Sequence, residues 1–226
     1  MRAQSVVNLD PIDRNRKKQP GLIGRFFMTK RFGGKSVNRT DEFGHYLFTG
    51  RQRSGKTVSC LFMAEKLKER YEKRGCKVLL YSNFGIGIPF NRLNLFKIFE
   101  GITYDSKVVH IFLIDEIQSW FPKDTKDPQI LRDIDRLTGE FSQLGKRQIY
   151  VLSTAQVYGR LNKNLREQCL YMVNCRLGMF NKCINDFIPG DDIMCDELGR
   201  WSGIPSKIWK HGLPKTNFDT HALVKF

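Results

Sequence analysis

The sequence predicts an α/β domain of three layers, in which helices cover both faces of a mostly parallel sheet. Apolar runs of strand length alternate with segments of helical periodicity along most of the chain. A glycine-rich pattern typical of phosphate binding stands between the first of these strands and the first helix. The 226 residues are 41% hydrophobic and 12% aromatic, which supports a full core and excludes a disordered chain.

Composition and pattern divide the chain into three regions. Residues 1–40 form a basic N-terminal arm, residues 41–180 the core of the domain, and residues 181–226 a short irregular C-terminal lobe that completes it. The arm carries ten Lys or Arg against two Asp or Glu, within a net formal charge of +15 for the whole chain. Such arms contact polyanions, because each phosphate that they neutralise releases a condensed counterion. The alternative is a solubilising tail.

Neither a membrane span nor a secretory signal is expected. No apolar run approaches the roughly 20 residues that a helix needs to cross a bilayer. The N-terminus also lacks the apolar stretch of a signal peptide. The sequence therefore predicts a soluble, intracellular protein.

The first predicted strand, at 45–49, leads directly into GRQRSGKT at 50–57. This octapeptide fits the phosphate-binding pattern G-x-x-x-x-G-K-[ST]. A helix is expected after it, because apolar residues recur on one side as far as Gly75, which suits a helix end. That side carries Val58, Leu61, Phe62, Met63 and Leu67.

The spacing of the phosphate loop has a mechanical reason. Gly50 and Gly55 let the backbone turn so that N–H groups converge on the phosphates at the positive end of the helix. Lys56 would reach the β- and γ-phosphates, and Thr57 would place its hydroxyl on Mg²⁺. The expected contacts to ATP come from Gly50, Arg51, Gln52, Arg53, Ser54, Gly55, Lys56, Thr57 and Val58.

A near-continuous apolar run at 107–118 ends in two carboxylates, Asp115 and Glu116. Strands buried on both faces of a parallel sheet have this pattern, and carboxylates at their carboxyl ends face the ligand crevice. Asp115 is the expected partner of Thr57 in holding Mg²⁺. Glu116 is placed to accept a proton from an attacking water.

The intervening segments continue the strand–helix order. A strand is expected at 77–83, followed by a helix around 91–99. A longer helix is expected within 127–148, because Asp127 can cap it and Pro128 suits its first turn. Its buried stripe consists of Ile130, Ile134, Leu137, Phe141 and Leu144.

The strand expected at 148–156 ends in the polar residues Thr154 and Gln156. An amide at that end can touch both the γ-phosphate and the attacking water. Gln156 is therefore predicted to sense which nucleotide is bound.

Together these motifs resemble an ATPase of the FtsK/HerA superfamily over about residues 45–176. The resemblance rests on GRQRSGKT, on the apolar run into DEIQSWFP, and on GKRQIYVLSTAQ followed by LNKNLREQC. Within the superfamily, the chain is similar to the small branch of zonula-occludens-toxin-like proteins of filamentous phages and genome-packaging ATPases of membrane-containing icosahedral viruses. The ending TNFDTHALVKF is also similar to a Tyr-Asp-Thr element near the end of such domains.

The resemblance implies a P-loop domain of the RecA/FtsK-like type that assembles into a ring, usually a hexamer. Such rings hydrolyse ATP with Mg²⁺ between subunits and pull double-stranded DNA through a basic pore. The resemblance implies catalytic roles for Lys56, Glu116 and Gln156. An arginine from the neighbouring subunit completes such sites; Arg147 is the first candidate and Arg166 the second. Arg132, Arg136 and Arg160 remain open.

Toxin-like relatives carry a transmembrane helix and a further domain after the ATPase domain, and this sequence shows neither. We therefore expect a viral genome-packaging ATPase that pumps double-stranded DNA into a preformed capsid. It would act in the host cytoplasm or at the packaging vertex of the virion, beside a capsid vertex protein or a membrane protein. The alternatives are a toxin-like phage assembly ATPase, a plasmid DNA-transfer ATPase and, in another class, a P-loop small-molecule kinase.

Overall fold

The computed structural model describes residues 42–94, 98–179, 182–196 and 200–215. The predicted basic arm at 1–40 and the ending at 216–226 lie outside these residues. No helix in the described part is both long and apolar enough to cross a membrane.

Within the described residues, an eight-stranded sheet forms the middle layer, in the order β10-β7-β6-β1-β5-β4-β2-β3. The six strands β6, β1, β5, β4, β2 and β3, which follow one another in the sheet, are parallel to their neighbours. Strand β7 runs antiparallel to both of its neighbours, β6 and β10. The predicted α/β fold with a mostly parallel sheet is therefore confirmed. The strands are β1 (Gly44–Thr49), β2 (Lys77–Ser82), β3 (Asn91–Arg92), β4 (Val108–Ile114), β5 (Ile149–Ala155), β6 (Cys169–Leu177), β7 (Cys183–Pro189) and β10 (Lys207–His211).

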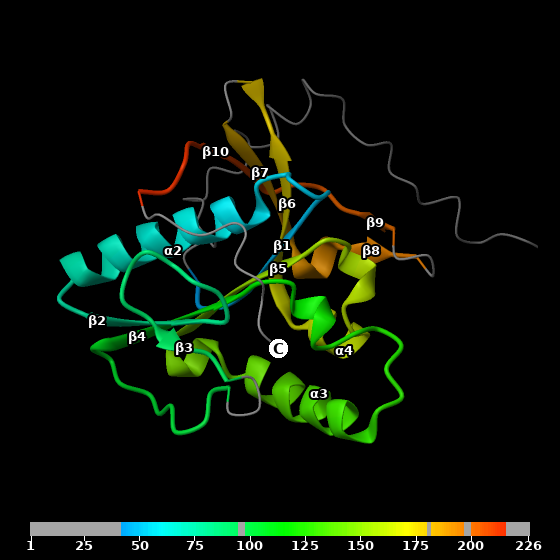
Figure 1. Cartoon of the computed structure of the whole chain (residues 1–226), viewed down its shortest axis with the longest axis horizontal. Helices are drawn as coiled ribbons and strands as arrows, with labels where there is room; N and C mark the ends of the chain where they lie inside the picture. Colours follow the sequence, from blue (N-terminus) through cyan, green and yellow to red (C-terminus); the bar gives the residue numbers. More distant parts are fainter. Residues whose placement is uncertain (1–41, 95–97, 180–181, 197–199, 216–226) are drawn as a thin grey trace, which may run out of the picture. The chain divides into compact units, whose positions relative to one another are not determined.

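Helices cover the sheet on both faces (Figure 1). The helix α2 (Lys56–Lys73) lies on one face, and α3 (Pro128–Phe141) and α4 (Lys163–Glu167) lie on the other. A separate two-stranded pair joins β8 (Met194–Cys195) to β9 (Trp201–Ser202). The short 3-10 turns are Ile117–Ser119, Gly145–Arg147, Tyr158–Arg160 and Gly190–Asp192.

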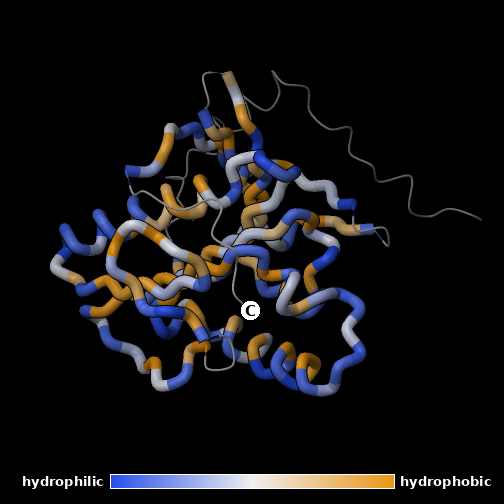
Figure 2. The backbone as a smooth tube through the Cα atoms, viewed as in Figure 1, coloured by the Kyte–Doolittle hydropathy of each residue, from blue (hydrophilic) through white to orange (hydrophobic). Residues whose placement is uncertain are grey.

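The core lies on the two faces of the central strands, which are the orange segments in the middle of Figure 2. Side chains alternate along each strand, so one face of β1 carries Tyr46 and Phe48 and the other carries Leu47. All three are fully buried. Burial on both faces explains why β1, β4 and β5 have continuous apolar runs instead of an alternating pattern.

Helix α3 forms as its sequence predicts. The Asp127 carboxylate accepts a hydrogen bond from the backbone N–H of Gln129 at 2.8 Å, and Pro128 occupies the first turn. Within the predicted stripe, Ile130 is half-buried and the other four residues are buried. This stripe packs against the face of the sheet that carries Leu47.

The helix expected around 91–99 is wrong at its start. Asn91 and Arg92 form the short strand β3 beside β2, and the backbone N–H of Leu93 donates to the carbonyl of Ser82 at 2.8 Å. The open edge of β2 offers unpaired backbone groups, and pairing with them outweighs weak helical periodicity. Residues 95–97 lie outside the described part.

The buried side of α2 is also rotated from the expected one. Val58 and Phe62 are only half-buried, while Cys60 and Ala64 are buried beside Leu61. Residues after 182 are more regular than the sequence suggests, because β7 and β10 extend the main sheet. These two strands matter for the site, since β7 packs against the loop that precedes α2.

Candidate nucleotide-binding site

The loop between β1 and α2 is held so closely that only glycine fits at two positions. Gly50 has φ +147°, and a Cβ there would lie 2.5 Å from the carbonyl oxygen of Cys175. Gly55 has φ +85°, and a Cβ there would lie 2.8 Å from the Cys183 sulfur. Strands β6 and β7 therefore fix the path of the loop, and both glycines of the phosphate-binding pattern are explained by steric contact.

Lys56 is the first residue of α2 and follows the loop directly. The Lys56 ammonium donates to the carbonyls of Gly50 at 3.2 Å and Arg51 at 3.1 Å, so it folds back across the loop. The first helical hydrogen bond runs from the Ser59 N–H to the Gly55 carbonyl at 2.8 Å. The N–H groups before Ser59 stand at the positive end of the helix, which suits an anion.

Asp115 is the meeting point of three elements. Its Oδ1 accepts hydrogen bonds from the hydroxyls of Thr57 at 3.2 Å and Thr154 at 2.5 Å. Asn83, which follows β2, accepts from the Asp115 N–H at 2.8 Å and donates to the Asp115 carbonyl at 3.1 Å. Two threonines thereby hold the Asp115 carboxylate beside the phosphate loop, and Asn83 holds the Asp115 backbone.

The Thr57 hydroxyl and the Asp115 carboxylate are the oxygen ligands that Mg²⁺ prefers. They come from the two motifs that the sequence singles out, and they are within hydrogen-bond distance of each other. A metal held by one or two protein oxygens and by phosphate oxygens fits this arrangement. The residues present therefore fit a Mg²⁺–nucleotide complex.

Glu116 follows Asp115 in a left-handed backbone conformation, with φ 52°. Its N–H donates to the Thr154 hydroxyl at 3.0 Å. Both carboxylate oxygens accept from amides: Oε1 from Gln156 at 3.4 Å, and Oε2 from Gln118. The structure thus brings Glu116 and Gln156 together at the carboxyl ends of neighbouring strands.

The first arginine candidate lies away from this cluster, and the second lies on α4. Arg147 precedes β5 and Gln156 follows it, so the two residues lie at opposite ends of the strand. For a strand of this length the separation is about 20 Å. Arg147 is therefore out of reach of the Glu116 carboxylate in the same chain. It is ion-paired with Glu140 at 2.5 Å. Arg166 is the second candidate, and its Nη1 contacts the Cys195 sulfur at 2.9 Å.

Among the other three candidates, Arg160 lines the same hollow as Glu116. This hollow has a volume of about 700 Å³ and is also lined by Gln118, Gln156 and Lys123. Arg132 and Arg136 lie on α3 and donate respectively to the side chain of Gln129 and to the carbonyl of Ile98.

Sequence reasoning gave no role to three residues that shape the site. Asn83 holds the Asp115 backbone, Thr154 bridges Asp115 and Glu116, and Gln118 contacts the Glu116 carboxylate. A signal was present for the first two, since each is a polar residue at the carboxyl end of a predicted parallel strand. Gln118 lies in the DEIQSWFP segment that carries the resemblance, but its contact with Glu116 depends on the turn after Glu116.

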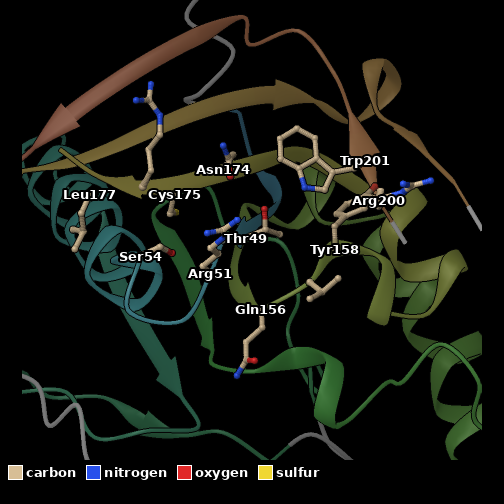
Figure 3. A pocket seen from close by; sticks show the side chains of 13 residues that line it. Thr49, Arg51, Ser54, Gln156, Tyr158, Asn174, Cys175, Leu177, Arg200 and Trp201 are labelled. Atoms are coloured by element: carbon tan, nitrogen blue, oxygen red, sulfur yellow. The ribbon is translucent and has the colours of Figure 1, made fainter. Parts of the chain in front are cut away.

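A larger hollow, the loop cavity, opens beside the phosphate loop (Figure 3). Its volume is about 740 Å³. It is bounded by the loop, by the carboxyl end of β6 and by β9. Its lining includes Thr49, Arg51, Ser54 and Trp201.

The structure is similar to the crystal structure of the N-terminal domain of zonular occludens toxin from Neisseria meningitidis. The TM-score is 0.53 and the sequence identity 17%, over 77% of this chain and 96% of that one. The genome packaging NTPase B204 from Sulfolobus turreted icosahedral virus 2, in complex with AMPPCP, matches with a TM-score of 0.41 and 12% identity, over 73% of this chain and 98% of that one. A TM-score of 0.41 is too low to show that the two proteins share a fold.

No protein-family model matches the chain, and no curated protein matches it either. The toxin domain nevertheless agrees with the fold that the sequence predicts, and the phosphate loop lies between β1 and α2 as that fold requires. In fold, this chain is a P-loop α/β protein of the kind represented by the N-terminal domain of zonular occludens toxin.

Proposed function

We propose that this protein hydrolyses ATP and uses the energy to move double-stranded DNA. The observation that carries the proposal is the convergence of Lys56, Thr57, Asp115, Glu116 and Gln156 at one edge of the sheet. A phosphate loop alone would bind a nucleotide. A carboxylate and an amide beside it supply the groups that hydrolysis needs.

Each residue has a role in the proposed reaction. The loop N–H groups and Lys56 hold the β- and γ-phosphates, while Thr57 and Asp115 hold Mg²⁺. Mg²⁺ neutralises charge on the phosphate oxygens when it is bound. Glu116 takes a proton from a water whose oxygen attacks the γ-phosphorus, and the bond to the oxygen that bridges the β- and γ-phosphates breaks. Gln156 donates to Glu116 and so orients the carboxylate.

The proposed nucleic-acid partner rests on charge and on motif resemblance. The net formal charge of +15 favours a polyanion over a basic or neutral partner. The motifs resemble those of ring-forming DNA motors, in which a neighbouring subunit completes each site. We infer a ring of identical subunits, usually a hexamer, that packages a viral genome at the vertex of a preformed capsid. A capsid or membrane protein would anchor it there.

The test measures ATP hydrolysis with and without duplex DNA, together with the mass of the assembly. The expected result is turnover that rises with duplex DNA, in particles of several 26.4 kDa subunits. A small-molecule kinase would instead transfer the γ-phosphate to an added acceptor and ignore DNA. A permanent monomer whose turnover is indifferent to duplex DNA would overturn the proposal.

A further inference from the structure

The loop cavity lies directly beside the phosphate loop. Gly50, Arg51 and Ser54 of the phosphate loop form one of its walls. Its volume of about 740 Å³ is within the range of small-molecule pockets, roughly 300–1,000 Å³. It is therefore large enough for the part of a nucleotide that the phosphate loop does not hold.

Two buried hydroxyls face this cavity without a partner. The side chains of Thr49 and Ser54 are 1% and 9% exposed, and within the described part of the chain neither hydroxyl oxygen has a hydrogen-bond partner. Buried polar atoms are nearly always hydrogen-bonded in folded proteins. A ligand hydroxyl, which both donates and accepts, would satisfy these two oxygens.

Trp201 provides an aromatic surface across the cavity from the phosphate loop. Its indole projects into the cavity in Figure 3, on the side opposite Ser54, with Thr49 between them in that view. The ring is only half-buried. Nucleobases stack on such rings because each base has a flat π-face.

These features lie in the order of a nucleotide: an anion site at the loop, unpartnered hydroxyls next to it, and an aromatic ring beyond. We infer that the loop cavity binds the nucleoside half of the nucleotide, with the base stacked on Trp201 and the ribose at the Thr49 and Ser54 hydroxyls. This inference rests on the proposed function. It adds a base-recognition site to the phosphate site.

The first experiment compares ATP with inorganic tripolyphosphate, which has the same phosphates and no nucleoside. Trp201→Ala should weaken ATP binding about tenfold or more, the usual effect of removing a stacking ring. Its affinity for tripolyphosphate should stay at the wild-type level. Trp201→Phe keeps an aromatic face and should retain most of the affinity for ATP.

Trp209→Phe is the matched control. Trp209 packs edge-to-face against Phe62 and does not line the loop cavity, so its substitution should leave both affinities unchanged. Unchanged ATP binding by Trp201→Ala would overturn the inference, and so would an equal loss for both ligands. If the wild-type protein binds neither ATP nor tripolyphosphate, the proposed function itself fails. That outcome is distinguishable from a failure of the inference about Trp201, in which the wild-type protein still binds both ligands.

A fluorescence measurement covers the case in which Trp201→Ala does not fold. The chain has three tryptophans, so replacing Trp120 and Trp209 by Phe leaves Trp201 as the sole indole. ATP should quench its emission, and tripolyphosphate should not. Emission that responds to neither ligand, although both bind, would contradict stacking on Trp201.

Thr49→Val tests the ribose end of the cavity. The substitution keeps the shape and removes an unpartnered buried hydroxyl, so thermal stability should stay the same or rise. ATP affinity should fall about fivefold, the effect of one lost hydrogen bond. Stability that falls while ATP affinity stays the same would show that the hydroxyl supports the fold, and it would contradict the ribose contact.

Discussion

At the scale of single residues, the Glu116 carboxylate is the group on which hydrolysis depends. Glu116→Gln keeps the size and the two amide neighbours but cannot accept a proton. We expect nucleotide binding at wild-type affinity and a turnover reduced about 10²-fold or more, because the attacking water lacks its base. Equilibrium binding and steady-state phosphate release measure the two quantities separately.

The matching control for Glu116→Gln is Gln118→Ala, which removes one amide from the carboxylate and leaves the base in place. Turnover by Glu116→Gln at the wild-type rate would show that another group activates the water. A parallel loss of nucleotide binding would mean that Glu116 supports the loop, and not the chemistry.

His45 predicts a pH dependence of stability. It lies fully buried in β1, between the Ser153 hydroxyl at 2.6 Å and the Cys169 sulfur at 3.2 Å. Burial lowers the pKa of His45 to about 3, so the folded protein keeps a neutral imidazole while the unfolded chain takes up a proton below about 6.5. The stability that this residue contributes is complete above pH 6.5. It is lost as the pH falls toward 3.

Denaturant unfolding at pH 7.5 and pH 5 checks this expectation. The free energy of unfolding should fall by about 2 kcal/mol through His45 alone. His110 and His211 add to the same trend, since burial lowers the pKa of each. In His45→Asn the fall over this range should be smaller; an identical fall would show that His45 is not the titrating group.

At the scale of elements, α3 is the clearest case of a helix determined by its own sequence. Asp127 caps it, and Asp127→Ala should lower the free energy of unfolding by about 1 kcal/mol. Asp124→Ala removes an exposed loop carboxylate of the same charge and serves as control. Equal small effects in both variants would mean that charge, and not the cap, explains the loss.

The phosphate loop is an element whose sequence pattern is local and whose conformation depends on distant strands. The residue spacing predicted the loop, and the strand before it and the helix after it are confirmed. The contacts that exclude a side chain at Gly50 and Gly55 come from Cys175 in β6 and Cys183 in β7. Those strands lie more than a hundred residues further along the chain, and no local pattern relates them to the loop.

The segment around 91–99 shows the reverse case. Its weak helical periodicity was a poor guide, because the edge of β2 offered backbone hydrogen bonds to the residues at 91 and 92. Strand pairing of this kind depends on which edge is open, and a single stretch of sequence does not contain that information.

At the scale of the whole molecule, the proposed ring predicts a site shared between subunits. Arg147 cannot reach the Glu116 of its own chain, so it can act only on a neighbour. Arg147→Ala should be inactive alone, since a finger arginine contributes about 10³-fold or more to the rate. Mixing it with Lys56→Ala should restore some hydrolysis, because a complete site forms wherever the intact Lys56 of one subunit meets the intact Arg147 of its neighbour.

Glu140→Gln is the control for Arg147, since it removes the same ion pair and leaves the guanidinium. If Glu140→Gln is equally inactive, the ion pair supports the fold and no finger is needed to explain the loss. Failure of rescue at every mixing ratio would count against Arg147 as the arginine supplied by the neighbouring subunit. Arg166 would then be the next candidate.

The sequence by itself determined the elements whose signals are short-range: the phosphate loop, the cap of α3, and the apolar runs that end in Asp115, Glu116 and Gln156. The tertiary structure alone decided how these residues meet. Asn83 and Thr154 reach Asp115 from 32 and 39 residues away, and Trp201 faces the phosphate loop across the loop cavity. Periodicity reports which face of an element is buried, whereas the order of strands in the sheet determines which element ends lie side by side.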